Sequence, residues 1–337
     1  MVVNDSHLIT ELLSDTISTP EIKVISKVQD GTQAFRKIKH ERPDVILLDL
    51  EMPNMDGLTF LENMMKDNPI PTIVVSSYAQ RGTQIVFDAL DCGAVDFATI
   101  PMVNTEKITK LKTNLVSKIK IAARAKPRLF SHHYSSNQDS FKKIDTITAD
   151  RVVVIGASTG GPGVISQIMA SLPADLKAGV IIVQHMSDSF TKYFAMRLNE
   201  RSLLQVNEAS NGEKIKRGVA LLAPGDNHLV VKPSFSVSLN NGPKRMGVRP
   251  SINMTMVTAS EVYRDKTIGV LLSGMGQDGA FGMKMIKKRC GVTIAQDESS
   301  SVIFGMARAA KELGAVNKLV PAEKIAEEII RAVENNA

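Results

Sequence analysis

The chain has 337 residues, of which 43% are hydrophobic and 23% are charged, and its formal net charge is +6. The length predicts two domains, and the composition is that of a globular protein. No apolar stretch approaches the roughly eighteen residues that cross a bilayer, and the first residues lack a signal peptide's basic and apolar regions, so we expect no membrane insertion. The basic residues are not interleaved with aromatics and form no recognition module, so we expect no nucleic-acid partner.

Short apolar runs alternate with helical patterns from the start of the chain to about residue 125. This alternation predicts five strands, at residues 2–3, 22–28, 45–48, 72–75 and 94–99. Helical spacing of apolar residues predicts helices at 8–17, 32–39, 58–66, 81–90 and 106–125. Strand and helix units that alternate in this way predict an α/β domain with a parallel sheet that is doubly wound, meaning that helices cover both faces.

Carboxylates gather where two of these strands end. Asp49 follows the strand at 45–48, and Asp5 follows the first strand. Because chemistry collects at the carboxyl ends of parallel strands, we expect both side chains at one edge of the sheet. Two carboxylates there repel each other unless a hard cation separates them, and Mg²⁺ suits such a site. Ser76, which ends the next strand, is placed to donate its hydroxyl to a phosphoryl group.

These residues lie in segments that resemble a response-regulator receiver domain, which has a flavodoxin-like fold. The resemblance implies that Asp49 is the phosphoacceptor, that Ser76 is the switch hydroxyl, and that a chemotaxis histidine kinase is the phosphodonor. It also implies that Asp5, Asp49 and the backbone carbonyl of Glu51 hold Mg²⁺. The segments that carry the resemblance are residues 4–6, 43–49, 52–57, 75–77 and 93–97.

Three features depart from the receiver pattern. Asn4 replaces one member of the usual acidic pair, the first strand is unusually short, and Ile100 stands where a lysine is expected before Pro101. In the family that lysine contacts the phosphoryl group and helps to transmit its arrival. The departures therefore predict weaker metal binding and impaired signalling, and they leave open a receiver that acts only as a lid.

The helical and strand patterns stop between residues 125 and 149, where the sequence is polar and contains His132 and His133. We interpret this segment as a linker, and the histidine pair lacks a third metal ligand. The predicted domains are therefore residues 1–124 and 150–337, joined by 125–149. In the second domain we predict strands at 152–155, 179–183, 219–222, 268–272 and 292–295, with helices at 163–171, 189–198, 280–289 and 322–333.

The second domain is also predicted to be a doubly wound, Rossmann-like parallel sheet. The alternating pattern at residues 215–239 predicts an antiparallel hairpin inserted in that sheet. The cysteines, Cys92 and Cys290, fall in different predicted domains and have no metal-ligand spacing. We interpret them as buried reduced thiols, and we expect a cytoplasmic monomer.

The segment 152–163 reads VVVIGASTGGPG and places Ser158 between two glycines directly after an apolar strand. This G-x-S-x-G pattern exposes a serine hydroxyl at the end of a strand, but a glycine-rich turn can also hold a phosphate. A nucleophile needs a base, and His185 ends the next strand of the domain, whereas His228 is interpreted as a loop residue. Asp278 follows the strand at 268–272 and can orient the imidazole.

The order serine, histidine, aspartate differs from that of α/β-hydrolases. With the flanking residues, it resembles the catalytic domain of chemotaxis protein-glutamate methylesterases. The carrying segments are residues 155–161, 184–186, 190–198, 223–225, 249–251, 274–279 and 302–306.

This resemblance implies a nucleophile at Ser158, a general base and acid at His185, and an orienting carboxylate at Asp278. It implies oxyanion stabilisation by the Met275 N–H with support from Thr159. The substrates would be methyl-accepting chemotaxis receptors, and the catalytic domain would need no cofactor. Two alternatives stay open, a nucleotide-binding module that uses the turn at 156–163 and a non-catalytic signalling adaptor with a degenerate receiver.

Overall fold

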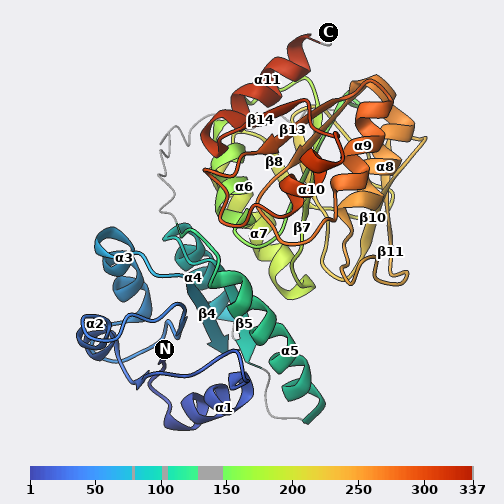
Figure 1. The fold of residues 1–337 in the computed structure, drawn as a ribbon. Coiled ribbons are helices and arrows are strands. Elements are labelled where there is room, and N and C mark those ends of the chain that lie inside the picture. The colour runs from blue at the N-terminus through green and yellow to red at the C-terminus, as the bar shows by residue number, and fades with distance from the viewer. Residues whose placement is uncertain (78–79, 101–104, 128–146, 336–337) are drawn as a thin grey trace. The chain divides into compact units, whose positions relative to one another are not determined.

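The computed structural model describes residues 1–77, 80–100, 105–127 and 147–335 of the chain (Figure 1). The chain divides into two compact units, Met1–Ser131 and His132–Ala337, and each is described by itself. The predicted linker lies largely outside the described residues, as do its paired histidines and Pro101.

Within the described part of the first unit, five parallel strands form one sheet in the order β2-β1-β3-β4-β5. Helices α1 and α5 contact each other, as do α2 with α3 and α3 with α4, so the helices form two groups (Figure 1). This is the doubly wound sheet that the sequence predicts. The strands are β1 (Val2–Val3), β2 (Lys27–Val28), β3 (Ile46–Leu48), β4 (Thr72–Ser77) and β5 (Asp96–Ile100). The helices are α1 (His7–Ile17), α2 (Gly31–Ile38), α3 (Gly57–Asp67), α4 (Gln80–Asp91) and α5 (Thr105–Ala122).

The strand predicted for residues 22–28 is wrong over most of its length, because β2 has only the two residues Lys27 and Val28. These residues pair with Val2 and Val3, which are the whole of strand β1. Upstream, Ile22 turns back to bridge Thr19 in the antiparallel sense.

Within the described part of the second unit, seven parallel strands form a sheet in the order β14-β13-β12-β6-β7-β9-β8. The central strands β6 and β7 are buried along their whole length, which explains their unbroken apolar sequences. The strands are β6 (Val152–Ala157), β7 (Gly179–Gln184), β8 (Gln205–Glu208), β9 (Val219–Leu222), β12 (Thr267–Leu271), β13 (Val292–Gln296) and β14 (Lys318–Val320).

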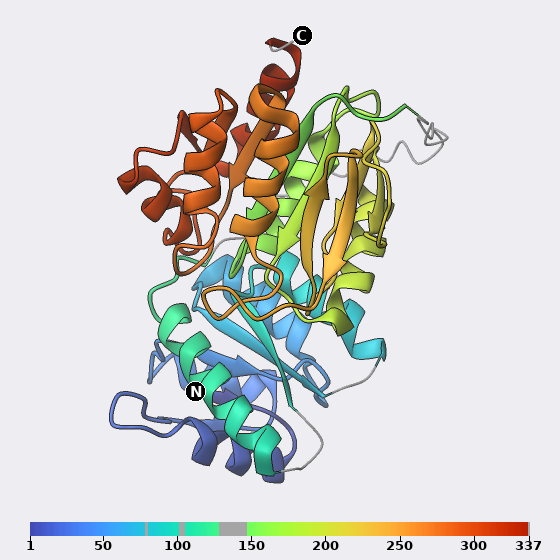
Figure 2. The same cartoon turned by 90° about the vertical axis from the view of Figure 1, so that its right-hand side faces the viewer.

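Helices again form two groups in the second unit. Helix α6 contacts α7 and α11, whereas α8 contacts α9 and α9 contacts α10 (Figures 1 and 2). The α-helices are α6 (Gly161–Ser171), α7 (Asp188–Arg201), α8 (Ile252–Tyr263), α9 (Ala280–Lys288), α10 (Met306–Glu312) and α11 (Ile325–Asn335). Two short 3-10 helices are η1 (Arg264–Lys266) and η2 (Ala322–Lys324).

The predicted antiparallel hairpin exists, but it is not inserted in the large sheet. Strands β10 (His228–Lys232) and β11 (Ser236–Asn240) pair only with each other among the described strands, and β10 packs against helix α8. Helix α8 was not predicted, nor were α10, β8 and β14. The hairpin and α8 thus add a layer beside the large sheet (Figure 2).

Two glycines allow close approaches that bring α8 and the β12 loop to the end of β6. A Cβ atom on Gly156 would lie 2.3 Å from Ile252 Cγ2, at the start of α8. A Cβ atom on Gly274 would lie 2.7 Å from Ser158 Cβ. The ends of β6, β12 and α8 therefore meet at one place.

Candidate active site

Ser158 is the first residue after strand β6 and is half-buried. The turn that follows passes through Gly160, whose φ of 74° is left-handed, and helix α6 begins at Gly161. The Ser158 N–H donates to the carbonyl of Ser273 at 3.0 Å, and the Ser158 carbonyl accepts from the Gly161 N–H at 2.8 Å. The turn is thus fixed by its own backbone, with the side chain of Ser158 at the end of the sheet.

His185 follows strand β7, the neighbour of β6. Ala157 and Gln184 are register partners, and the His185 N–H donates to the Ala157 carbonyl at 3.0 Å. Ser158 and His185 therefore leave adjacent strands at the same level of the sheet. The buried Gln184 amide links the two backbones, because its Nε2 donates to the Ser158 carbonyl at 3.0 Å and to the His185 carbonyl at 3.2 Å.

The imidazole of His185 is hydrogen bonded to Asp278, with 3.0 Å between Nε2 and Oδ2. Both side chains are largely shielded from solvent. Among the described residues, the hydroxyl of Ser158 is hydrogen bonded to neither of them. Because Nε2 is engaged with Asp278, Nδ1 is the ring nitrogen that remains for a serine proton.

Asp278 is buried against the N-terminus of helix α8, whose N-cap is Ser251. The Ser251 hydroxyl donates to Oδ1 at 3.0 Å, the Ile252 N–H donates to Oδ2 at 2.7 Å, and the Asn253 N–H donates to Oδ1 at 3.0 Å. The first N–H groups of a helix lack partners within it, so a carboxylate satisfies them.

Burial of the Asp278 carboxyl group would by itself raise its pKa. The hydrogen bond and charge of His185, together with the N–H groups of Asn253 and Ile252, outweigh burial and lower the pKa from its ordinary value. Asp278 is therefore ionised at neutral pH and fixed in place, as an orienting carboxylate must be.

Met275 and Thr159 flank the serine on two different loops. Within the described residues, the Met275 N–H donates to no acceptor, and its side chain is 54% exposed. The Thr159 side chain is half-buried, and its carbonyl accepts from the Ser273 hydroxyl at 2.9 Å. The Ser158 N–H, in contrast, is engaged with the Ser273 carbonyl.

In the first unit, the carboxylate of Asp49 lies at the carboxyl end of β3. Asn4 Nδ2 donates to Asp49 Oδ2 at 2.7 Å, and the Glu51 N–H donates to Oδ1 at 3.2 Å. Burial raises the pKa of Asp49 to about 6, and the negative charge of nearby Asp5 adds to this effect. Ser76 is half-buried at the end of β4, and Ile100 is the last residue of β5.

The described residues contain no cluster of three His, Cys, Asp or Glu side chains that could hold a metal ion. The predicted Mg²⁺ site uses only two carboxylates, those of Asp5 and Asp49, and a backbone carbonyl of Glu51. All three are oxygen donors, which is the kind of ligand that Mg²⁺ takes.

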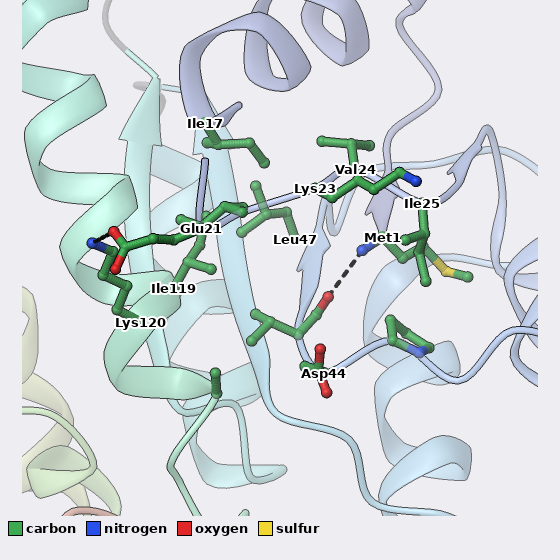
Figure 3. A pocket seen from close by; sticks show the side chains of 14 residues that line it. Met1, Ile17, Glu21, Lys23, Val24, Ile25, Asp44, Leu47, Ile119 and Lys120 are labelled. Carbon is green, nitrogen blue, oxygen red and sulfur yellow. Dashed lines mark hydrogen bonds and ion pairs between the residues drawn. The ribbon is translucent and has the colours of Figure 1, made fainter. Parts of the chain in front are cut away.

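A cavity of about 160 Å³ lies in the first unit, beside Met1 and Val45, which precede β1 and β3 (Figure 3). Its wall includes Ile17 and Leu47, and the Met1 amine donates to the Val45 carbonyl at 3.0 Å. Because it opens at the amino ends of β1 and β3, it is separate from the carboxylate site.

The interpretation of His228 as a loop residue is wrong, because His228 begins strand β10 and is buried. Sequence reasoning also gave no role to Gln184, Ser251 or Asn253. A signal for Ser251 was present, since a serine before an apolar run is typical of a helix N-cap. Gln184 could have been noticed as a polar residue that ends an apolar strand.

Comparisons with known proteins agree with this architecture. A family model described as CheB methylesterase matches residues 153–329, and one described as response regulator receiver domain matches residues 1–112. The protein-glutamate methylesterase/protein-glutamine glutaminase of Pyrococcus abyssi is 43% identical over 99% of this chain and 93% of its own. The protein of the same name from Symbiobacterium thermophilum is 38% identical over 99% and 96%, respectively.

Among solved structures, the Thermotoga maritima CheB methylesterase catalytic domain is 42% identical and has a TM-score of 0.52. The match covers 54% of this chain and 97% of that one. Among the described residues, no helix is both long and apolar enough to span a membrane. The order of the two matched regions and the full-length similarity to named relatives show that this chain belongs to the CheB methylesterase family, with a response regulator receiver domain preceding the methylesterase domain.

Proposed function

We propose that the chain is a serine hydrolase that removes methyl groups from glutamate γ-methyl esters of methyl-accepting chemotaxis receptors in the cytoplasm. The same site would deamidate receptor glutamines, as the two-part names of the relatives suggest. The observation that carries the proposal is the 3.0 Å hydrogen bond between His185 and Asp278, whose carboxylate is held by the start of helix α8. His185 follows β7, the strand that pairs with the one preceding Ser158.

In the proposed reaction, the Ser158 hydroxyl oxygen attacks the ester carbonyl carbon while His185 accepts the hydroxyl proton at Nδ1. Asp278 holds the ring through Nε2 and stabilises its positive charge. The Met275 N–H, supported by Thr159, stabilises the oxyanion. Collapse breaks the bond to the methoxy group, which leaves as methanol with the proton from His185. Water, activated by His185, then hydrolyses the acyl-enzyme and restores the glutamate; from glutamine the leaving group is ammonia.

The turn after β6 supports hydrolysis better than nucleotide binding. The Gly161 N–H, which a phosphate at the start of α6 would need, already donates to the Ser158 carbonyl. The presence of Ser158, His185 and Asp278 at neighbouring strand ends also favours an enzyme over a non-catalytic adaptor.

We further propose that phosphorylation of Asp49 by a chemotaxis histidine kinase regulates this activity. Asp5, Asp49 and the Glu51 carbonyl would hold Mg²⁺, which when bound offsets the charge of a phosphoryl group. Asn4 donates a hydrogen bond to Asp49 where a second acid would repel it, so a weak Mg²⁺ site is expected. Ser76 would be the switch hydroxyl.

The direct test is methanol release from methylated chemoreceptors by the purified full chain. Ser158→Ala removes the nucleophile, and we expect release to fall at least about 10³-fold, toward the background rate. Ser166→Ala, which changes a buried serine within α6, is the matched control and is expected to retain activity. Unchanged release by Ser158→Ala would overturn the proposed mechanism.

A further inference from the structure

Helix α8 carries a buried chain of hydrogen bonds that ends on the proposed orienting carboxylate. The His228 side chain is only 1% exposed, and the Ser251 N–H donates to its Nδ1 at 3.2 Å. The Ser251 hydroxyl in turn donates to Asp278 Oδ1 at 3.0 Å. One serine therefore connects a buried imidazole through its backbone and a buried carboxylate through its side chain.

The donors and acceptors of this chain define the protonation state of His228. Because Nδ1 accepts a hydrogen bond from a backbone N–H, it carries no proton. The proton of the neutral ring then lies on Nε2, which donates to the Pro243 carbonyl at 3.1 Å. His228 thus ties the loop that contains Pro243 to Ser251. Both ring nitrogens are engaged in these hydrogen bonds, so neither remains to take a proton from the substrate.

We propose that Ser251 and His228 are positioning residues for the hydrolase, holding the Asp278 carboxylate in the orientation that His185 needs. This inference rests on the proposed function. Asp278 Oδ1 is bound by Ser251 and Asn253, so the carboxylate cannot rotate without breaking those bonds. Its other oxygen, Oδ2, faces His185 and the Ile252 N–H. His228 acts one step further away, by fixing the backbone of Ser251.

Asn253 reinforces the arrangement from the other side. Its side-chain oxygen accepts hydrogen bonds from the Gly279 N–H at 3.0 Å and the Gly282 N–H at 2.7 Å. The start of α8 therefore binds both Asp278 and the start of α9, the helix that follows Asp278 in the chain. A shift of Ser251 would move the carboxylate relative to His185, and not only weaken the fold.

The first experiment compares Ser251→Ala with Ser260→Ala. Ser260 is buried near the other end of α8, and its hydroxyl donates to the Val257 carbonyl at 2.7 Å, far along the helix from Asp278. Ser251→Ala removes a hydrogen bond to a charged group, so kcat for methanol release should fall about tenfold with KM unchanged. Ser260→Ala should leave kcat unchanged.

The pH profile separates positioning from a general loss of structure. Without the Ser251 hydroxyl, Asp278 presents more of its negative charge to His185 and favours the imidazolium form. The acid limb of kcat/KM should therefore move to higher pH in Ser251→Ala and stay in place in Ser260→Ala. An unchanged kcat and acid limb in Ser251→Ala would overturn the inference, as would equal losses in the two variants without a shift of the limb.

His228 is tested by the contrast between Asn and Leu. His228→Asn supplies an acceptor oxygen near the position of Nδ1, so it should keep most of kcat, whereas His228→Leu should lose about as much as Ser251→Ala. In the combined variant with Ser251→Ala, the His228→Leu change should add little, because both act through Asp278. Equal activity of the Asn and Leu variants would remove His228 from the proposal. If Ser158→Ala still releases methanol, the proposed function fails, whatever Ser251→Ala does.

Discussion

At the scale of single residues, Asp278 combines burial with strong hydrogen bonding. Its folded pKa is lowered below the ordinary value of 3.8, so its ionised form stabilises the folded state. The sign follows from proton binding: above 3.8 the carboxylate is charged in both states and the full stabilisation is present. The stabilisation is lost as the pH falls below 3.8 through the folded pKa.

We therefore expect Asp278→Asn to lower the free energy of unfolding at pH 7 by about 2 kcal/mol, the order of a hydrogen bond to a charged group. The difference from the native protein should shrink as the pH is lowered from 5 toward 3. Urea unfolding across that range measures it, with the exposed Asp175→Asn as the control. A difference that stays constant at all pH values would contradict this account of Asp278.

At the scale of secondary-structure elements, the end of helix α9 contains a residue that its backbone disfavours. The prediction that both cysteines are buried is wrong, because Cys92 is half-buried and Cys290 is exposed. Cys290 has a φ of 65°, in the left-handed region. Its N–H donates to the Lys287 carbonyl, and the Gly291 N–H donates to the Ile286 carbonyl, which is the pattern of a Schellman motif. Glycine is the usual residue at this position because it has no Cβ.

Cys290→Gly should raise the free energy of unfolding of the second unit by about 1 kcal/mol, by relieving this conformation. Cys290→Ala removes the thiol and keeps a Cβ, so it should show no such gain. Thermal unfolding of both variants gives the comparison. Equal effects of Gly and Ala would mean that the thiol, and not the backbone, determines stability here.

At the scale of the whole molecule, the proposed regulation requires that phosphorylation of Asp49 in the receiver domain changes the rate of hydrolysis in the second domain. We expect a small-molecule phosphodonor with Mg²⁺ to increase methanol release by the native chain and to leave Asp49→Asn unaffected. Ile100 is the register partner of Ser77, next to Ser76, and it replaces the lysine of the family pattern. Ile100→Lys should therefore enlarge the response to the donor. If neither the native chain nor the Ile100→Lys variant releases methanol faster with the phosphodonor, the proposed regulation is contradicted.

The sequence predicted the main sheet strands and the residues that follow them, because buried parallel strands read as apolar runs and their carboxyl ends share an edge. This reasoning placed Ser158, His185, Asp278 and Asp49 after strands, where the structure also has them. Helix α8 was missed because Thr255 and Ser260 occupy positions of its buried face. Their hydroxyls bond to backbone carbonyls, so the face is buried without an apolar pattern.

The remaining parts of the site depend on contacts that no local pattern contains. The hydrogen-bond donors at the start of α8 lie about 25 positions before Asp278 in the chain, and they reach its carboxylate only once α8 packs beside α9. The length of β2 likewise depends on its pairing with β1 and not on its own apolar residues.

The pairing of β12 with β6 also has a consequence for synthesis of the protein. His185 and Asp278 are separated by 93 positions in the chain, so the serine and histidine leave the ribosome well before the aspartate. Strand β12 must then find its place beside β6, which is already flanked on its other edge by β7. Under the proposed mechanism, a chain that ends before Asp278 has the serine and the histidine but lacks the carboxylate that orients the imidazole, so full activity requires the last third of the domain.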